Sequence, residues 1–127
     1  MEFVVAVVAV VAVVAAGIDS GRSGSTPLSP LAATGGAAFD QNCASCHGVN
    51  GTGSDKGPPL LHDIYNPGHH NDESFFRAAS QGTPRHHWNF GDMPPQSKVS
   101  RQDMTAIVRY IRELQEANGI VWRKHTM

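Results

Sequence analysis

Cys43-Ala44-Ser45-Cys46-His47 is the stretch of sequence that decides the fold of this chain. Side chains three positions apart are neighbours on the surface of a helix, so both thiols lie on one side of a single turn. They can therefore reach the two vinyl groups on one edge of a porphyrin, and the histidine that follows can bind the iron beneath the ring. This pattern is the attachment signature of c-type haem.

A redox pair, a structural disulfide and half of a zinc site compete with this interpretation. A zinc site needs further cysteines or a well-spaced pair of histidines, and Cys43 and Cys46 are the only cysteines in the 127-residue sequence. A redox pair usually lies in a βαβ unit, and the sequence has no such pattern. We therefore expect one covalently attached haem c. Residues 36–119 should be largely unfolded without it, because so small a domain has a meagre core of its own.

Two helices are predicted in the first two thirds of the chain. One begins at Gly35 or Gly36, with Thr34 as its N-cap, and continues through the haem signature. The other is DESFFRAASQ, residues 72–81, which Asn71 or Asp72 can cap and which stops at Gly82.

The last helix has the clearest pattern. Ser100 and Asp103 form a variant of the capping box at its start, and Asn118-Gly119 supplies its end. Between these ends, apolar residues recur at helical spacing: Met104, Ile107, Val108, Ile111 and Leu114. With no alternating strand pattern in the chain, we expect an all-α fold, a small bundle of three or four helices around one haem.

Residues 3–18 are almost wholly valine and alanine. They are too few to span a bilayer untilted, which takes about twenty residues, and they fit the apolar core of a secretory signal peptide. Glu2 stands where a basic residue is expected, so residues 1–18 are either a signal peptide or a short uncleaved membrane anchor. In both cases we expect export to the periplasm or to the outer face of the cytoplasmic membrane, where bacteria attach haem covalently.

Residues 19–34 are predicted to be a flexible linker, because ten of the sixteen are Gly, Ser, Thr or Pro. The haem domain then spans residues 35–119, and residues 120–127 form a C-terminal tail. The formal net charge of −1 argues against a nucleic-acid partner, which would require clustered Lys and Arg.

Residues 35–119 resemble the class I cytochromes c, which are small monohaem electron carriers. The resemblance rests on four segments: GAAFDQNCASCHG at residues 36–48, GPPL at 57–60, DMP at 92–94 and IVRYIREL at 107–114. It implies that the first and last helices cross, with Gly36 and Phe39 meeting Tyr110.

The resemblance also implies the ligands of the haem iron. His47 is the proximal ligand, and the carbonyl of Pro58, in the loop that ends at Leu60, accepts its Nδ1 proton. Met93, which precedes a proline, is the distal ligand. The residues support Met93 independently, because Met104 belongs to a helical stripe whereas no helix explains Met93.

Two histidine pairs, His69-His70 and His86-His87, leave the sixth iron ligand open. Any of these four could replace Met93, and His/His ligation would lower the reduction potential. They could instead be solvated loop residues or donors to a haem propionate. They could also hold copper or zinc if their loops converge. Among their neighbours, Arg85 is expected to pair with a propionate, and Trp88 and Phe90 are expected to pack on the haem edge.

We expect a monomeric protein that carries single electrons and is not an enzyme. Redox protein partners, exported or bound to the membrane, would dock transiently, and residues 3–18 could tether the protein to the membrane. Two alternatives remain. One is a haem sensor or peroxidatic domain with an open or His-ligated sixth position, and the other is a cytochrome subunit of a larger membrane oxidoreductase.

Overall fold

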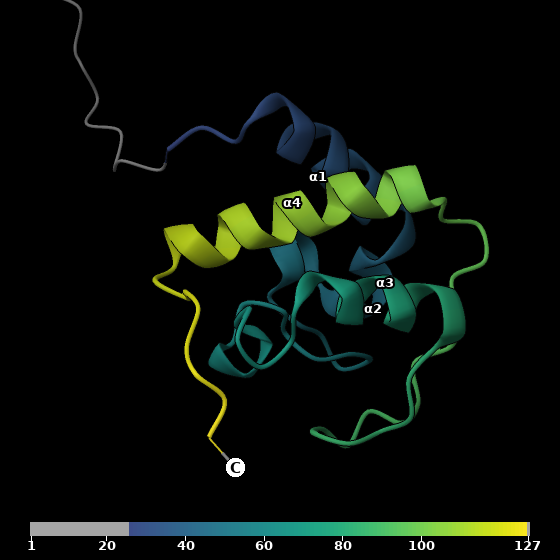
Figure 1. The fold of residues 1–127 in the computed structure, drawn as a ribbon. Coiled ribbons are helices and arrows are strands. Elements are labelled where there is room, and N and C mark those ends of the chain that lie inside the picture. Colours follow the sequence, from purple (N-terminus) through teal and green to yellow (C-terminus); the bar gives the residue numbers. More distant parts are fainter. Residues whose placement is uncertain (1–25, 127) are drawn as a thin grey trace, which may run out of the picture.

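The structure, a computed structural model, describes residues 26–126. The expected signal peptide or anchor, residues 1–18, and the first part of the expected linker lie outside the described residues. The described part is helical, with one isolated bridge between Thr83 and Met93 and no strand (Figure 1). Its α-helices are α1 Pro30–Asn42, α2 Ala44–His47, α3 Asp72–Gln81 and α4 Arg101–Ala117, and its 3-10 turns are η1 Val49–Gly51 and η2 Asp63–Tyr65. The all-α prediction is confirmed.

Among these helices, none has the length and apolar character that crossing a bilayer requires. The predicted starts and ends of α3 and α4 agree with the structure. Asn71 caps α3, which ends before Gly82, and Ser100 and Asp103 form a complete capping box on α4.

The first helix begins earlier than predicted, at Pro30, and its N-cap is Ser29 and not Thr34. The Ser29 hydroxyl accepts a hydrogen bond from the Ala32 N–H at 3.2 Å. Its own Oγ and N–H donate to the Glu113 carboxylate of α4 at 2.6 and 2.9 Å. Because this start is fixed by a residue far along the chain, residues 30–34 belong to the folded domain and not to a linker.

α1 and α4 lie against one another, as Figure 1 shows, and cross at two adjacent glycines. Gly35 brings the two backbones into direct contact, because a Cβ built there would lie only 1.8 Å from the Ala106 carbonyl oxygen. Gly36 faces Tyr110, whose ring centroid is 5.5 Å from that of the fully buried Phe39. The contact that the resemblance implies is present, and Gly35 makes the closer approach.

Gly35→Ala is expected to destabilise the holoprotein by about 2 to 3 kcal/mol, because the added methyl group collides with backbone that cannot rotate away. At an open helical position the same change would stabilise by up to about 1 kcal/mol. Gly36→Ala is the matched control. Its Cβ would meet the Tyr110 ring at 3.1 Å, and a side chain can move. The measurement is the free energy of unfolding in guanidinium chloride. Equal losses of unfolding free energy in the two variants would contradict the close backbone contact at Gly35.

The chain after α4 leaves that helix and runs down one side of the domain (Figure 1). Ile120 is buried, and the Arg123 N–H donates to the Asn66 side-chain oxygen at 3.1 Å. Arg123 also pairs with the Asp63 carboxylate at 3.5 Å. Trp122, by contrast, is 65% exposed and does not pack into the core.

Candidate haem-binding site

A cavity of about 500 Å³ lies among α1, α3, α4 and the loops between them. Phe39, Leu60 and Phe75 contribute apolar walls, and α4 adds Met104, Ile107 and Ile111. Eight of the nine residues predicted to bind the cofactor line this cavity: Cys43, His47, Pro58, Leu60, Arg85, Trp88, Phe90 and Met93. The ninth, Cys46, borders an adjoining cavity of about 120 Å³ that shares Cys43, His47 and Met93 with the first.

The haem signature lies at a break between two helices. α1 ends at Asn42, and Cys43 (φ −125°, ψ −33°) separates it from α2. The expectation of one continuous helix through His47 is therefore wrong. The hydrogen-bond ladder nevertheless continues, because the Cys43 N–H donates to Phe39 O at 2.8 Å and the His47 N–H donates to Cys43 O at 2.9 Å. No disulfide joins the two cysteines. Cys43 is half-buried and Cys46 is exposed.

The environment of Cys43 does not favour thiol–disulfide exchange. Burial, with a smaller contribution from the neighbouring Cys46, raises the pKa of the Cys43 thiol to about 11. Redox CxxC pairs work in the opposite way, through a lowered thiol pKa that supplies the nucleophilic thiolate. Two unpaired thiols beside an apolar cavity fit covalent attachment of a cofactor better than a redox cycle.

One ring nitrogen of His47 is hydrogen-bonded to the backbone, and the other is free to bind a metal ion. Its Nδ1 lies 2.9 Å from the Pro58 carbonyl oxygen, and because a carbonyl can only accept, Nδ1 carries the proton. Nε2 is left with a lone pair. Burial lowers the pKa of His47, which favours the neutral imidazole that binds metal ions. A backbone carbonyl partner of this kind orients metal-binding histidines and raises their basicity.

Met93 stands at the base of an anchored loop. Thr83 and Met93 exchange two backbone hydrogen bonds of 3.0 and 2.9 Å. Within the loop, the Arg85 N–H donates to the Asp92 carboxylate at 2.9 Å. These bonds fix where the Met93 side chain leaves the backbone at the cavity wall. Met104 also reaches the cavity but is buried within α4, in agreement with its predicted place in the helical stripe.

Tyr65 is a cavity residue that sequence reasoning missed. The Trp88 indole N–H donates to its hydroxyl at 3.0 Å, and burial raises the pKa of the Tyr65 phenol. Trp88 also packs edge-on against His62, with ring centroids 5.1 Å apart, and lies near Phe90. Tyr65 lies in a short 3-10 turn, so no periodic pattern marks it in the sequence.

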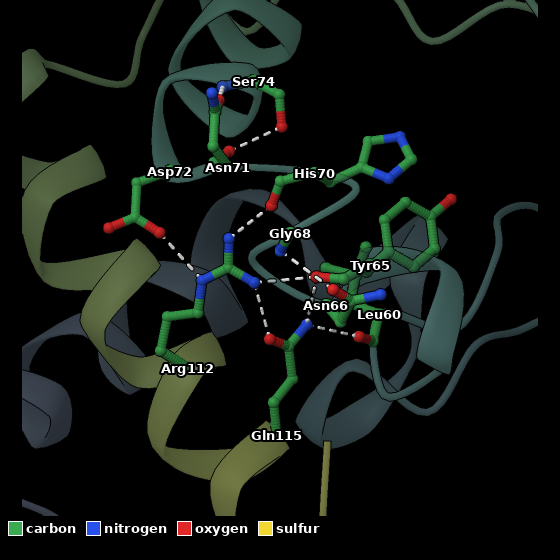
Figure 2. Close-up of polar contacts among 10 residues, drawn as sticks. All are labelled: Leu60, Tyr65, Asn66, Gly68, His70, Asn71, Asp72, Ser74, Arg112 and Gln115. Carbon is green, nitrogen blue, oxygen red and sulfur yellow. Dashed lines mark hydrogen bonds and ion pairs between the residues drawn. The ribbon is translucent and has the colours of Figure 1, made fainter. Parts of the chain in front are cut away.

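Arg112 joins α4 to the loop that supports this part of the cavity (Figure 2). The residue is only 7% exposed. Its Nε donates to the Asp72 carboxylate at 2.8 Å, and Nη1 donates to Tyr65 O and to the Gln115 side-chain oxygen, each at 2.7 Å. Nη2 donates to His70 O. The guanidinium group therefore fixes the backbone on both sides of the loop that carries Tyr65 and His70.

Arg112→Ala is expected to lower the free energy of unfolding by about 3 kcal/mol, because it removes all four hydrogen bonds of the guanidinium group and leaves the His70 carbonyl without its donor. Arg109→Ala on the same helix is the control. Arg109 makes a half-exposed i,i+4 pair with Glu113, and such pairs contribute about 0.5 kcal/mol. Denaturant unfolding of both holoproteins is the measurement. If Arg112→Ala lowers the free energy of unfolding no more than Arg109→Ala does, the hydrogen bonds of Arg112 do not stabilise the loop as argued.

The four histidines that left the sixth iron ligand open also line the cavity. They lie together where it meets solvent, since His69 and His70 are half-buried and His86 and His87 are exposed. The His86 and His87 ring centroids are 4.2 Å apart, and those of His70 and His87 are 5.2 Å apart. His125 of the tail joins them, with its ring 4.3 Å from that of His69. Sequence reasoning did not find His125, because nothing local connects the tail to the loops.

Burial and the neighbouring imidazoles both lower the pKa values of two histidines in this cluster, His70 and His87. The pKa of His70 is lowered by burial and, to a lesser extent, by its proximity to His69, His87 and His86. The pKa of His87 is lowered by desolvation, His86 and His69. His70 and His87 are therefore biased towards the neutral form.

A comparison with models of known protein families found a match to the part of the chain that carries this site. The model of the family described as cytochrome c matches residues 32–115, well over half of the chain. The matched range contains the haem signature, the Pro58 loop, Met93 and nearly all of α4. No curated protein and no solved structure matched the chain.

Proposed function

Because the chain belongs to the cytochrome c family, we propose that it carries single electrons through one haem c bonded to Cys43 and Cys46. Members of this family bind haem c covalently and use it for electron transfer. We further propose that His47 and Met93 are the two ligands of the iron. The observation that carries the proposal is the meeting of three groups at one apolar cavity: the free thiol of Cys43, the available Nε2 of His47 and the thioether of Met93.

The residues present fit this cofactor. A cavity of about 500 Å³ is within the range of protein sites that hold small ligands and cofactors. Its walls are mostly apolar, which suits a porphyrin. The donor set, a neutral imidazole and a thioether, is one that cytochromes use and one that raises the reduction potential.

A bound haem c supplies an iron that alternates between Fe(III) and Fe(II). His47, oriented by Pro58, and Met93, anchored through Thr83, would hold the iron. Two protein ligands kept in both oxidation states would leave little geometry to reorganise. Leu60, Trp88 and the apolar wall of α4 limit the access of water, and burial of the site is one of the means by which a protein tunes the potential.

An electron carrier must expose part of its site to its redox partners, and the surface around Cys46 offers such an exposed region. Cys46 is exposed, and Val49, three residues later, is 73% exposed. We propose that exported or membrane-bound redox proteins dock here transiently with a monomeric chain, in the small contacts typical of electron transfer. Covalent haem attachment takes place outside the bacterial cytoplasm, which supports an exported location.

A second candidate is a site with a histidine, or no protein group, in the sixth position. The four histidines that line the same cavity favour it. A redox titration of the holoprotein followed by its visible spectrum separates the candidates. For the proposed carrier, we expect one reversible one-electron transition, low-spin spectra in both states, and a far-red sulfur-to-iron charge-transfer band in the oxidised form. A high-spin oxidised spectrum would overturn the proposal in favour of an open site, and a low-spin spectrum without the far-red band would favour histidine.

A further inference from the structure

Three histidines from two loops converge beside the haem cavity in a way that haem binding does not require. His69 and His70 lie in the loop before α3, and His87 lies in the loop between Thr83 and Met93. One ligand nitrogen from each of the three lies within 4.8 Å of those of the other two. His69 and His70 are half-buried and His87 is exposed, so an ion from solvent can reach them.

The spacing of the His69 and His87 nitrogens fits a shared metal ion. Zinc binds imidazole nitrogen at about 2.0 to 2.1 Å, usually in a tetrahedral arrangement. Two such bonds place their nitrogens about 3.3 to 3.4 Å apart by simple geometry. The Nε2 atoms of His69 and His87 are 3.4 Å apart. A direct hydrogen bond of that length between two imidazoles would be weak, so the separation is better suited to a shared ion.

In His69 and His70 the other ring nitrogen has a partner of its own. The Nδ1 of His70 lies 2.6 Å from the Ile64 carbonyl oxygen, and because the carbonyl accepts, Nδ1 carries the proton and Nε2 is free. The Nδ1 of His69 is in contact with the Nδ1 of His125, which leaves its Nε2 facing His87. Metal-binding histidines show this arrangement, in which one nitrogen is fixed by a hydrogen bond and the second is presented to the ion.

We propose that His69, His70 and His87 bind one divalent transition-metal ion, Zn²⁺ or Cu²⁺, at the opening of the haem cavity. Three imidazoles select these ions over Mg²⁺ and Ca²⁺, which prefer oxygen ligands. His86, whose ring centroid is 4.2 Å from that of His87, or a water molecule can fill the fourth position. The ion would tie the loop before α3 to the loop that ends at Met93, and would make the two pairs of adjacent histidines one functional unit.

Zinc titration of the holoprotein near neutral pH tests the site, with a chromogenic chelator as competitor. We expect one equivalent of Zn²⁺ to bind, and His69→Gln and His87→Gln each to weaken the affinity by about tenfold or more, since each removes a ligand. His62→Asn is the matched control. His62 is exposed and outside the cluster, and its Nδ1 accepts from the Ile64 N–H at 3.2 Å, a role that an asparagine oxygen reproduces. The affinity of the His62→Asn protein for zinc should equal that of the wild type.

The visible spectrum recorded during the same titration separates this site from the haem iron. An unchanged haem spectrum supports a separate site, because the ion then takes no ligand from the iron. A spectrum that changes as zinc binds would overturn the proposal, since it would mean that a cluster histidine is an iron ligand. So would the absence of binding, or equal affinity of the His87→Gln and His62→Asn proteins. These outcomes are distinct from failure of the electron-carrier proposal, which depends on the titration of the haem itself.

Discussion

Replacing Met93 by alanine is expected to abolish the far-red charge-transfer band of the oxidised protein and to lower its reduction potential by on the order of 0.1 to 0.2 V. The band arises from a sulfur-to-iron bond, so it cannot survive loss of the sulfur. The potential falls because a thioether favours Fe(II), whereas water or histidine favours Fe(III) more strongly. The substitution leaves the backbone hydrogen bonds between Met93 and Thr83 in place, so the loop should keep its position.

The spectrum of this variant also shows which group replaces the sulfur. A high-spin oxidised spectrum indicates water, and a low-spin spectrum without the band indicates capture by a neighbouring histidine such as His87. Met104→Leu is the control, because Met104 is the other methionine at the cavity and is buried in α4. It should keep both the band and the potential. If instead Met104→Leu loses the band and Met93→Ala retains it, the ligand assignment is wrong.

The predictions that the structure confirms depend on local chemistry. The capping box of Ser100 and Asp103 is complete within four residues, and Asn71 and Gly82 define α3 by the same short-range rules. The haem signature, which lies within the residues that the cytochrome c family model matches, likewise depends on two thiols and an imidazole within five residues. Each of these can be recognised from the sequence, because the atoms that make the interaction are neighbours along the chain.

The features that sequence reasoning missed depend on distant contacts. Ser29 becomes the start of α1 because its N–H and hydroxyl donate to Glu113, 84 residues away. Arg112 is buried because its acceptors, among them Asp72 and Tyr65, lie 40 and 47 residues earlier. The two histidine pairs already indicate a metal site as one alternative in the sequence, but nothing there indicates His125, which joins them only because the tail lies beside His69 in the folded chain. No local period or cap signals such contacts, and only the folded chain reveals them.

Removing both thiols, as Cys43→Ala/Cys46→Ala, is expected to prevent covalent haem attachment and to leave the domain largely unfolded. The reason is the size of the cavity. An empty volume of about 500 Å³ would cost at most about 12 kcal/mol, at roughly 24 cal/mol per Å³. Entry of water lowers that figure, but it remains comparable with the whole stability of a small domain, about 5 to 15 kcal/mol. The helices that surround the cavity therefore have too little to pack against without the porphyrin.

Two measurements on protein from an export-competent host test this expectation. The wild-type chain should remain red after acid–acetone extraction, whereas the double variant should be colourless and lose most of its far-UV helical signal. Ser45→Ala is the control, because Ser45 lies exposed between the two cysteines and its removal changes neither thiol nor His47. A colourless double variant that is still compact and helical would show that α1, α3 and α4 stabilise one another without haem, and the cavity would then have to be explained as a site for another ligand.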